Sequence, residues 1–232
     1  MQKDIQRSEE RGVGKHSWLS SRFSFSFADY YNPSRLGFGK LLVINDDTIM
    51  AGKGFGSHSH QNMEIITIVM QGSLEHKDST GISEVLKPGD VQLMSAGTGI
   101  VHSEYNHSSK EALQLFQIWI QPDKKNVTPR HATAHFSFPE NKLILVVSGK
   151  KTPDALLIHQ DAAISLGKFQ QGKKVSVSLS KDHGLYVFVI EGKLEVGIDV
   201  LEKRDAIGIT DMGKVDITFL EHSFVMIFDV VM

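Results

Sequence analysis

The sequence of 232 residues contains no cysteine. This absence excludes disulfides, iron–sulfur clusters and zinc sites that are built on cysteine. Neither sign of charge is in large excess, because 25 lysine and arginine residues stand against 27 acidic residues and the formal net charge is −2. A broad basic surface, of the kind that nucleic acids and anionic membranes bind, is therefore not expected.

Long apolar runs are also missing. The apolar runs, such as residues 143–147 and 186–190, are far short of the roughly 20 residues that a membrane-spanning helix needs. The first seven residues include charged side chains, and no apolar stretch follows them, which is unlike a secretory signal. We therefore expect a soluble, cytoplasmic protein with no membrane partner and no direct nucleic-acid partner.

What the sequence does contain is a dense β pattern. Short runs of Val, Ile, Phe and Thr are interrupted by Gly, Asp, Asn and Pro at intervals of about 8–12 residues, as in sandwiches and barrels. The runs that predict strands cover residues 40–44, 64–70, 91–94, 113–120, 143–147, 175–179, 186–190 and 224–230. Hydrophobic residues make up 41% of the chain, which is enough to build a core. The pattern predicts an all-β fold of the sandwich or barrel type.

An internal repeat is visible within this pattern. Residues 67–75 resemble residues 188–195 when the glycine in each block is aligned. Each block later reaches a turn that ends in an aspartate, Asp90 in the first and Asp205 in the second. A meander of this kind cannot bury its apolar face alone, so two copies predict two similar β units related by duplication.

The stretch 121–142 is polar and contains three prolines, so it is the natural crossing between the two units. We place the first unit at residues 1–133 and the second at residues 134–232. The alternative is one irregular β domain in which the internal similarity arose by chance.

Four residues stand out by their spacing. His58 and His60 form one i, i+2 pair, and His102 and Glu104 form another. Residues at i and i+2 of a strand point to the same face, so each pair can direct two ligands into one interior. Together they offer three imidazoles and one carboxylate, a set that suits Fe, Ni, Cu, Mn or Zn. The remaining histidines lack such spacing and are expected on the surface or hydrogen-bonded in the core.

The residues around these pairs resemble the two cupin motifs. The residues that carry this likeness are Gly52, His58, His60, Glu64 and Gly72 in the first motif, and Gly89, Asp90, Gly97, His102 and Glu104 in the second. More closely, residues 38–47, 54–64 and 89–104 resemble the pirin family of the cupin superfamily.

The pirin resemblance implies a bicupin, with two β-barrel or jelly-roll domains and one divalent metal per chain. The metal is expected in the N-terminal domain, held by His58, His60, His102 and Glu104. Iron(II) is the metal that the resemblance favours, with Ni, Cu, Mn and Zn as alternatives. The C-terminal repeat has neither a His-x-His nor a His-x-Glu pair, so no metal is expected there.

Two departures from the family pattern concern the first motif. Ser59 and Gln61 stand where family members usually have proline and arginine. Neither position is a ligand, so the metal site should survive, although the missing arginine alters the charge around it. Glu64 lies four residues after His60, not the usual five of ordinary cupins, so we expect it to hydrogen-bond a ligand imidazole rather than bind metal.

The resemblance implies two kinds of function. Some pirin-like proteins cleave the flavonol quercetin with dioxygen, which predicts a quercetin 2,3-dioxygenase-type enzyme that acts on an aromatic, flavonol-like substrate. Glu104 would then serve as the general base as well as a ligand, and Phe38, Phe55 and Met63 would line the substrate pocket. The eukaryotic members act as nuclear transcription cofactors, so an iron-binding, redox-responsive regulator with a protein partner is the alternative. A metal-binding module without turnover is a separate, third hypothesis.

Overall fold

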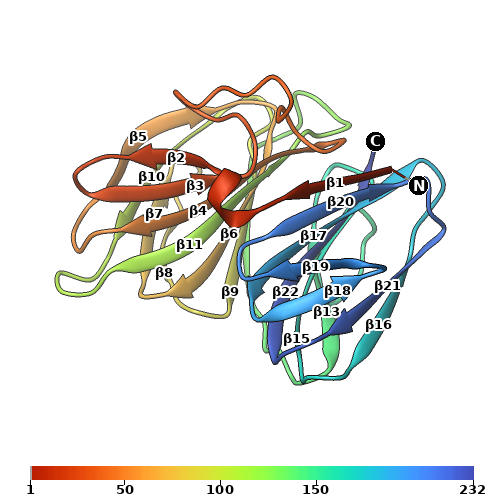
Figure 1. Cartoon of the computed structure of the whole chain (residues 1–232). Coiled ribbons are helices and arrows are strands. Elements are labelled where there is room, and N and C mark those ends of the chain that lie inside the picture. The colour runs from red at the N-terminus through yellow and green to blue at the C-terminus, as the bar shows by residue number, and fades with distance from the viewer. Residues whose placement is uncertain (1) are drawn as a thin grey trace.

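The computed structural model describes residues 2–232 (Figure 1). Over this range the chain forms 22 strands and one short 3-10 turn, η1 (Ser8–Glu10). The strands form two seven-stranded and two four-stranded sheets, which confirms the all-β prediction. No helical segment between residues 2 and 232 has the length and apolar character needed to cross a membrane.

The N-terminal half consists of one large and one small sheet. The large sheet has the strand order β12-β9-β6-β11-β4-β3-β2, and the small sheet has the order β5-β10-β7-β8. These strands are β2 (Gly12–Lys15), β3 (Leu19–Phe23), β4 (Leu41–Ile49), β5 (Gly54–His60), β6 (Glu64–Gln71), β7 (Leu74–Asp78), β8 (Ser83–Leu86), β9 (Asp90–Ser95), β10 (Ile100–Asn106), β11 (Leu113–Ile120) and β12 (Arg130–His135).

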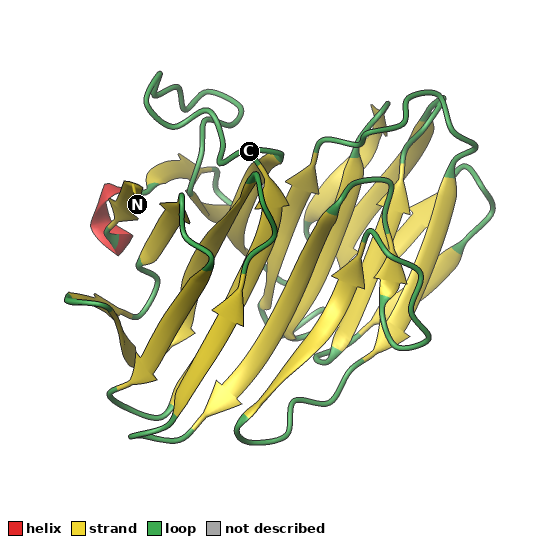
Figure 2. Cartoon of the chain, turned by 90° about the vertical axis from the view of Figure 1, so that its right-hand side faces the viewer, coloured by secondary structure: helices red, strands yellow, loops and turns green. Residues whose placement is uncertain are grey.

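The C-terminal half repeats this plan. Its large sheet has the order β1-β20-β17-β22-β15-β13-β14, and its small sheet has the order β16-β21-β18-β19. These strands are β1 (Gln2–Gln6), β13 (Lys142–Ser148), β14 (Leu156–Leu157), β15 (Ala162–Phe169), β16 (Lys174–Ser178), β17 (His183–Glu191), β18 (Lys193–Val196), β19 (Asp199–Glu202), β20 (Ala206–Thr210), β21 (Lys214–Phe219) and β22 (Ser223–Val231). Figure 2 shows the strands as closely aligned layers with the loops gathered at their ends.

The repeat seen in the sequence corresponds to equivalent structure. Gly72 joins β6 to β7 with φ +82°, and Gly192 joins β17 to β18 with φ +89°. A side chain at either glycine would collide with a backbone carbonyl oxygen, that of Ala112 or of His222, so both turns require glycine.

The aspartate turns of the two halves also match. The amide of Asp90 donates to the carbonyl of Lys87 over 2.9 Å, and the amide of Asp205 donates to that of Glu202 over 2.9 Å. In each turn the aspartate carboxylate accepts a hydrogen bond back from the amide three residues earlier, over 2.8 Å in the first and 3.1 Å in the second. The same residue type therefore closes the same turn in both halves.

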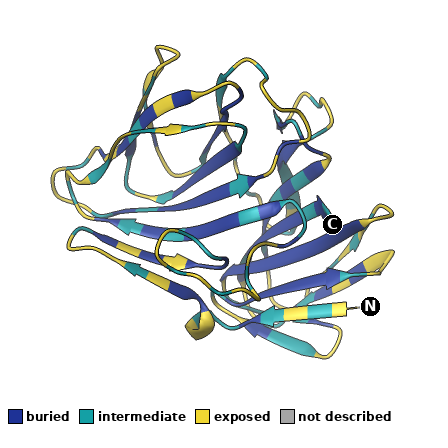
Figure 3. Ribbon diagram, turned by 90° about the horizontal axis from the view of Figure 1, so that it is seen from above, coloured by how far each residue is buried: buried dark blue, intermediate teal, exposed yellow. Residues whose placement is uncertain are grey.

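The two large sheets pack against each other through a shared hydrophobic core. Its largest cluster includes Ile66, Phe116 and Ile118 from the N-terminal half together with Tyr186 and Phe228 from the C-terminal half. Figure 3 shows the central strands buried and the loops and outer strands exposed. Because side chains alternate along a strand, the other face of the N-terminal large sheet points into its own barrel.

The chain crosses between the halves more than once. Strand β1 precedes the N-terminal sheet strands in sequence, yet it pairs with β20 of the C-terminal sheet (Figure 1). Strand β12 pairs with β9 and runs to His135, so the expected division after residue 133 falls inside a strand of the first half. The division into two units stays a prediction, and residues 2–6 depart from it by joining the second sheet.

Candidate metal centre

Two neighbouring strands of the small sheet, β5 and β10, carry the paired histidines. Their antiparallel register places His58 opposite His102 and His60 opposite Ile100. Along β10 the buried positions alternate, and His102 and Glu104 both point inward. The register shifts by a bulge between His102 and Glu104, and a bulge of this kind re-aims side chains.

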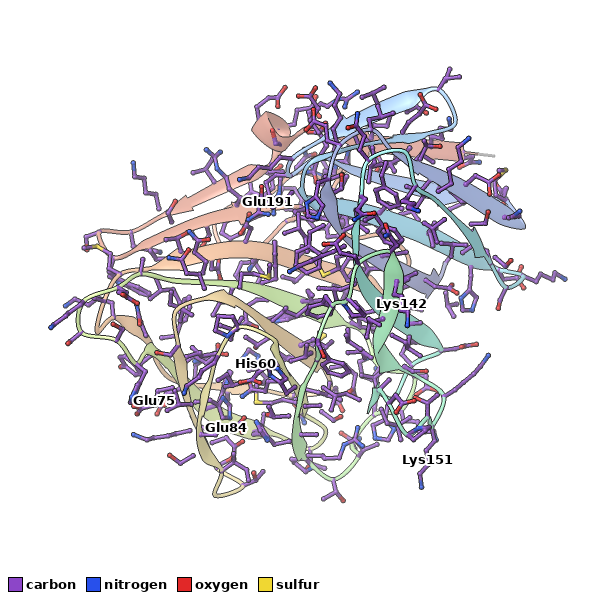
Figure 4. The ribbon with its side chains drawn as sticks, turned by 90° about the horizontal axis from the view of Figure 1, so that it is seen from below. His60, Glu75, Glu84, Lys142, Lys151 and Glu191 are labelled. Atoms are coloured by element: carbon purple, nitrogen blue, oxygen red, sulfur yellow. The ribbon has the colours of Figure 1, made fainter. Side chains whose placement is uncertain are left out.

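The three histidines come together as the spacing predicts. The ring centroids of His58 and His102 are 4.3 Å apart, those of His58 and His60 are 4.8 Å apart, and those of His60 and His102 are 4.9 Å apart. The Nε2 atoms of His60 and His102 face each other at 3.0 Å. In Figure 4, His60 lies among the side chains of the N-terminal half.

The donor atoms of this trio fit a metal ion. Two nitrogens that each bind a metal at about 2.1 Å, at right angles, stand about 3 Å apart. Burial lowers the pKa of His60 to about 4, with a further contribution from His58. Burial likewise lowers the pKa of His102. Both imidazoles are therefore neutral at pH 7, which is the form that binds metal.

Glu104 lies beside this trio but is held by other residues. Its two carboxylate oxygens each accept a hydrogen bond from the Gln117 amide nitrogen over 2.8 Å, and Thr67 donates to one of them over 3.4 Å. The donor atoms close to its carboxylate are those of His102 and His76. Burial raises its pKa, against the hydrogen bond from Gln117. The complete four-ligand set stays a prediction.

A cavity of about 890 Å³ opens onto these residues and is lined by His58, His60, His102, Glu104 and Gln117 among others. Its walls include the aromatic side chains of Trp18, Phe23, Phe27, Tyr30, Phe55 and Trp119. Phe55, one of the residues predicted to line a substrate pocket, thus lies in the wall of this cavity.

Two other predicted wall residues lie elsewhere. Phe38 is buried in the core between the halves, and Met63 packs beside Ile65 and Met94. Phe23 and Phe27 line the cavity as well. Phe25, which lies between them in the sequence, belongs to the shared core, because β3 ends at Phe23 and the chain then turns.

A second group of ligand-type side chains, His76, Asp78 and His131, lies behind His102. The Nε2 atom of His76 is 3.0 Å from an Asp78 oxygen, and the His76 and His131 rings stack at 4.9 Å. His131 in turn lies 3.0 Å from Glu84. His76 is thus a hydrogen-bonded core residue, as expected. Its His-x-Asp spacing is the same i, i+2 signal as in the other pairs, and sequence reasoning missed it.

Glu64 does not take the place predicted for it. Its carboxylate accepts a hydrogen bond from the Ser95 hydroxyl over 2.7 Å, and in the part of the chain that the structure describes it makes no hydrogen bond to a ligand imidazole. Burial raises its pKa to about 7, against the hydrogen bond from Ser95. The cause is its position at the start of β6, opposite Ser95 of β9, on the large sheet and not on the strands that carry the histidines.

Comparison with known proteins gives family matches across most of the chain. The family model described as Pirin matches residues 6–120, and the model described as Quercetinase C-terminal cupin domain matches residues 145–230. A protein of Escherichia coli strain K12 named quercetin 2,3-dioxygenase is 39% identical over 225 residues, which cover 97% of each chain.

Solved structures agree with these matches. The bacterial pirin YhhW of Escherichia coli, in complex with nickel(II), superposes with a TM-score of 0.95 at 38% identity and 99% coverage of both chains. A quercetin 2,3-dioxygenase of Acinetobacter baumannii shares the fold, with a TM-score of 0.78 at 21% identity over 98% of this chain and 85% of that chain. Two barrels of one design, one of them with converging histidines, define a bicupin. The chain belongs to the pirin family.

Proposed function

We propose that the protein is a metal-dependent dioxygenase that cleaves flavonol-type substrates with O₂, as a quercetin 2,3-dioxygenase does. The observation that carries this proposal is the convergence of three imidazoles at a large cavity that is partly lined by aromatic side chains. The cavity volume of about 890 Å³ is within the range of small-molecule sites. The name of the Escherichia coli relative and the nickel complex of YhhW support it.

His58, His60, His102 and Glu104 would hold one divalent metal, with iron(II) as the native metal and Ni, Cu, Mn or Zn as substitutes. Three nitrogens and one oxygen suit such an ion. When bound, the metal supplies Lewis-acid and redox chemistry for the reaction of the flavonol with oxygen. Of these ligands, His60 and His102 are already neutral before the ion arrives, and Glu104 is buried.

Glu104 would also accept the proton of the flavonol enol hydroxyl. A general base must lie within hydrogen-bond reach of that proton, and Glu104 lines the same cavity as the histidines. Its raised pKa favours holding a proton once it has taken one. Gln117 fixes the carboxylate through both oxygens, so Gln117 is a positioning residue for this step.

The cavity walls would orient the flat substrate and keep water away from it. Trp119 packs edge-to-face against His60 at 5.0 Å, and Trp18 packs edge-to-face against Phe55 at 5.2 Å. Aromatic faces of this kind bind aromatic rings through stacking and edge contacts. The proposed substrate is thus a small aromatic molecule.

The chain remains predicted to be cytoplasmic, without a nucleic-acid or membrane partner.

The test is oxygen uptake by the protein purified without oxygen and loaded in turn with Fe(II), Ni(II), Cu(II) and Mn(II). Quercetin is added, and loss of the flavonol absorbance and release of carbon monoxide are followed together. We expect turnover in which both atoms of O₂ enter the ring-opened product. If no metal form consumes oxygen with flavonols, the dioxygenase proposal fails and the redox-responsive regulator with a protein partner takes its place.

A further inference from the structure

Two polar residues on β4 reach the cavity without belonging to the metal centre. Asn45 and Asp47 are each only 3% exposed, and both line the cavity. The Oδ1 atom of each is buried and has no hydrogen-bond partner in the described structure. Buried acceptors are normally satisfied, so two unsatisfied ones at one cavity wall point to a ligand that supplies hydrogens.

Their register places them next to the catalytic machinery. Asn45 of β4 lies directly opposite Gln117 of β11, and Gln117 holds the Glu104 carboxylate. Asp47, two residues further along the strand, lies opposite Ser21 of β3. Inward side chains on neighbouring strands stand about 4.5–5.5 Å apart. A flat ligand that binds at the histidines can therefore extend along β4 and reach both acceptors.

The side chains of the cavity wall indicate which kind of ligand would donate these hydrogen bonds. The aromatic residues around the cavity accept a planar apolar body, and the two oxygens accept O–H or N–H hydrogens at its edge. The groups that act on the Asp47 carboxyl are the Ser21 hydroxyl, Asp46, Glu104 and Arg11. Burial is the largest influence and raises the pKa of Asp47 to about 7, so this carboxyl is suited to sharing a hydrogen with a phenol.

We propose that Asn45 and Asp47 are specificity-determining residues that accept hydrogen bonds from the ring hydroxyls of a polyhydroxylated flavonol. This inference rests on the proposed function and deepens it. The two residues would distinguish polyhydroxylated flavonols from flavonols that carry only the enol hydroxyl and the carbonyl. The metal ligands meet the part of the substrate that both kinds share. Asn45 and Asp47 meet the part in which they differ.

The probe is equilibrium binding without turnover. The chain contains two tryptophans, and both Trp18 and Trp119 line the cavity, so ligand binding should quench the intrinsic fluorescence. Nickel-loaded protein is titrated in the absence of oxygen with quercetin and with 3-hydroxyflavone. The second ligand keeps the enol and carbonyl but lacks the other hydroxyls.

Two apolar variants remove the acceptors, Asp47→Leu and Asn45→Leu. We expect each variant to bind quercetin roughly tenfold more weakly, which corresponds to about 1.4 kcal/mol and to the loss of one well-placed hydrogen bond. The affinity for 3-hydroxyflavone should change by no more than about twofold. The matched control is Asp46→Asn. Asp46 is the next residue on the same strand, but its carboxylate faces away and contacts Arg204 at 2.8 Å, so this variant should bind both flavonols like the parent protein.

Each outcome decides the matter. Unchanged quercetin affinity in both leucine variants overturns the inference and leaves the proposed function standing. An equal loss for both flavonols, repeated in the shape-conserving Asp47→Asn variant, also overturns it, because specificity would then not reside in this pair. If neither flavonol quenches the tryptophan fluorescence of the parent protein, the proposed function itself fails.

Discussion

At the residue scale, the interior of the N-terminal barrel drives ionisable side chains toward their neutral forms. Burial lowers the pKa of His60 and His102 and raises the pKa of Asp47 and Glu104, since a medium of low polarity disfavours charge of either sign. The neutral imidazoles are ready to bind a cation, and a cation would in turn favour the ionised form of Glu104.

The Glu104→Gln change tests the role of this carboxylate as a base. The amide keeps the size of the side chain but removes its charge and basicity. We expect turnover of quercetin to fall by roughly 10²–10⁴-fold, the range typical for loss of a general base. The rate must be divided by the bound metal, measured by elemental analysis, because Glu104 is also a predicted ligand. A normalised rate equal to that of the parent protein would remove Glu104 from the chemistry.

The Asp47→Asn change tests the burial of this carboxyl through stability of the metal-free protein. Its pKa is raised from 3.8 to about 7, so between these pH values the folded state keeps a proton that the unfolded state releases. The stability that this group contributes is complete below about pH 4 and is lost as the pH rises to about 7.

Asparagine removes this pH-dependent loss. The free energy of unfolding of the variant, relative to the parent, should therefore rise by roughly 2–3 kcal/mol between pH 5 and pH 8, given 1.36 kcal/mol per pH unit. Chemical denaturation of both proteins at the two pH values measures it. Glu64, whose pKa is also raised, contributes equally to both proteins and cancels. A difference that does not change with pH would show that Asp47 titrates normally.

The sequence predicts some of these residues and not others, for a physical reason. Two pairs can be recognised in the sequence, because ligands two residues apart on one strand face the same way. They are His58 with His60, and His102 with Glu104. Gln117 has no polar neighbour two residues away, and the i, i+2 pair of Asn45 and Asp47 contains no histidine that would mark it as metal-ligating. The pairing of β4 with β11 brings these residues to the same cavity. The local sequence of a strand does not specify which strand it will pair with.

At the scale of elements, the strands of the large N-terminal sheet serve two interiors. The even-numbered Ile66, Ile68 and Phe116 face the shared core, whereas Thr67 and Gln117 face the barrel and bond to Glu104. Strands buried on both faces read as continuous apolar runs with isolated polar residues. Those polar residues are the signal by which this barrel wall can be recognised.

The histidine strands allow a test of metal binding apart from folding. The His58→Ala, His102→Ala double variant removes one ligand from β5 and one from β10, but it leaves the hydrophobic clusters untouched. We expect the parent protein to bind one metal per chain and the variant to lose most of it, with an unchanged far-ultraviolet circular dichroism spectrum. Elemental analysis after dialysis gives the stoichiometry. Full retention of metal in the variant, or two metals per parent chain, would contradict the proposed site.

At the scale of the whole molecule, the two halves are joined by reciprocal contacts. Arg11 of the N-terminal half lies over the Phe188 ring at 4.9 Å, and Arg204 of the C-terminal half lies over the Phe116 ring at 5.2 Å. Both arginines also contact the Asp46 carboxylate, Arg204 at 2.8 Å and Arg11 at 3.5 Å. Each half thus places a cation on an aromatic ring of the other, and the halves should unfold together.

Strand β1 is the most direct of these links, and its removal is a test of the whole assembly. It pairs with β20 over five residues, packs Ile5 against the core of the C-terminal half and reaches back through Asp4 to Arg35. Without residues 2–6, the edge of β20 is left open, and an open edge favours pairing between molecules.

We therefore expect a protein that lacks residues 2–6 to melt roughly 5–15 °C lower, since 1 kcal/mol shifts Tm by about 2–4 °C at this chain length, and to self-associate on size-exclusion chromatography with light scattering. The Gln2→Ala variant is the control, because it changes an exposed side chain and keeps the backbone pairing. Metal content should stay the same in both proteins, since the histidines lie in the other half. A truncated protein that melts like the parent and stays in the same oligomeric state would show that β1 adds nothing to the union of the halves.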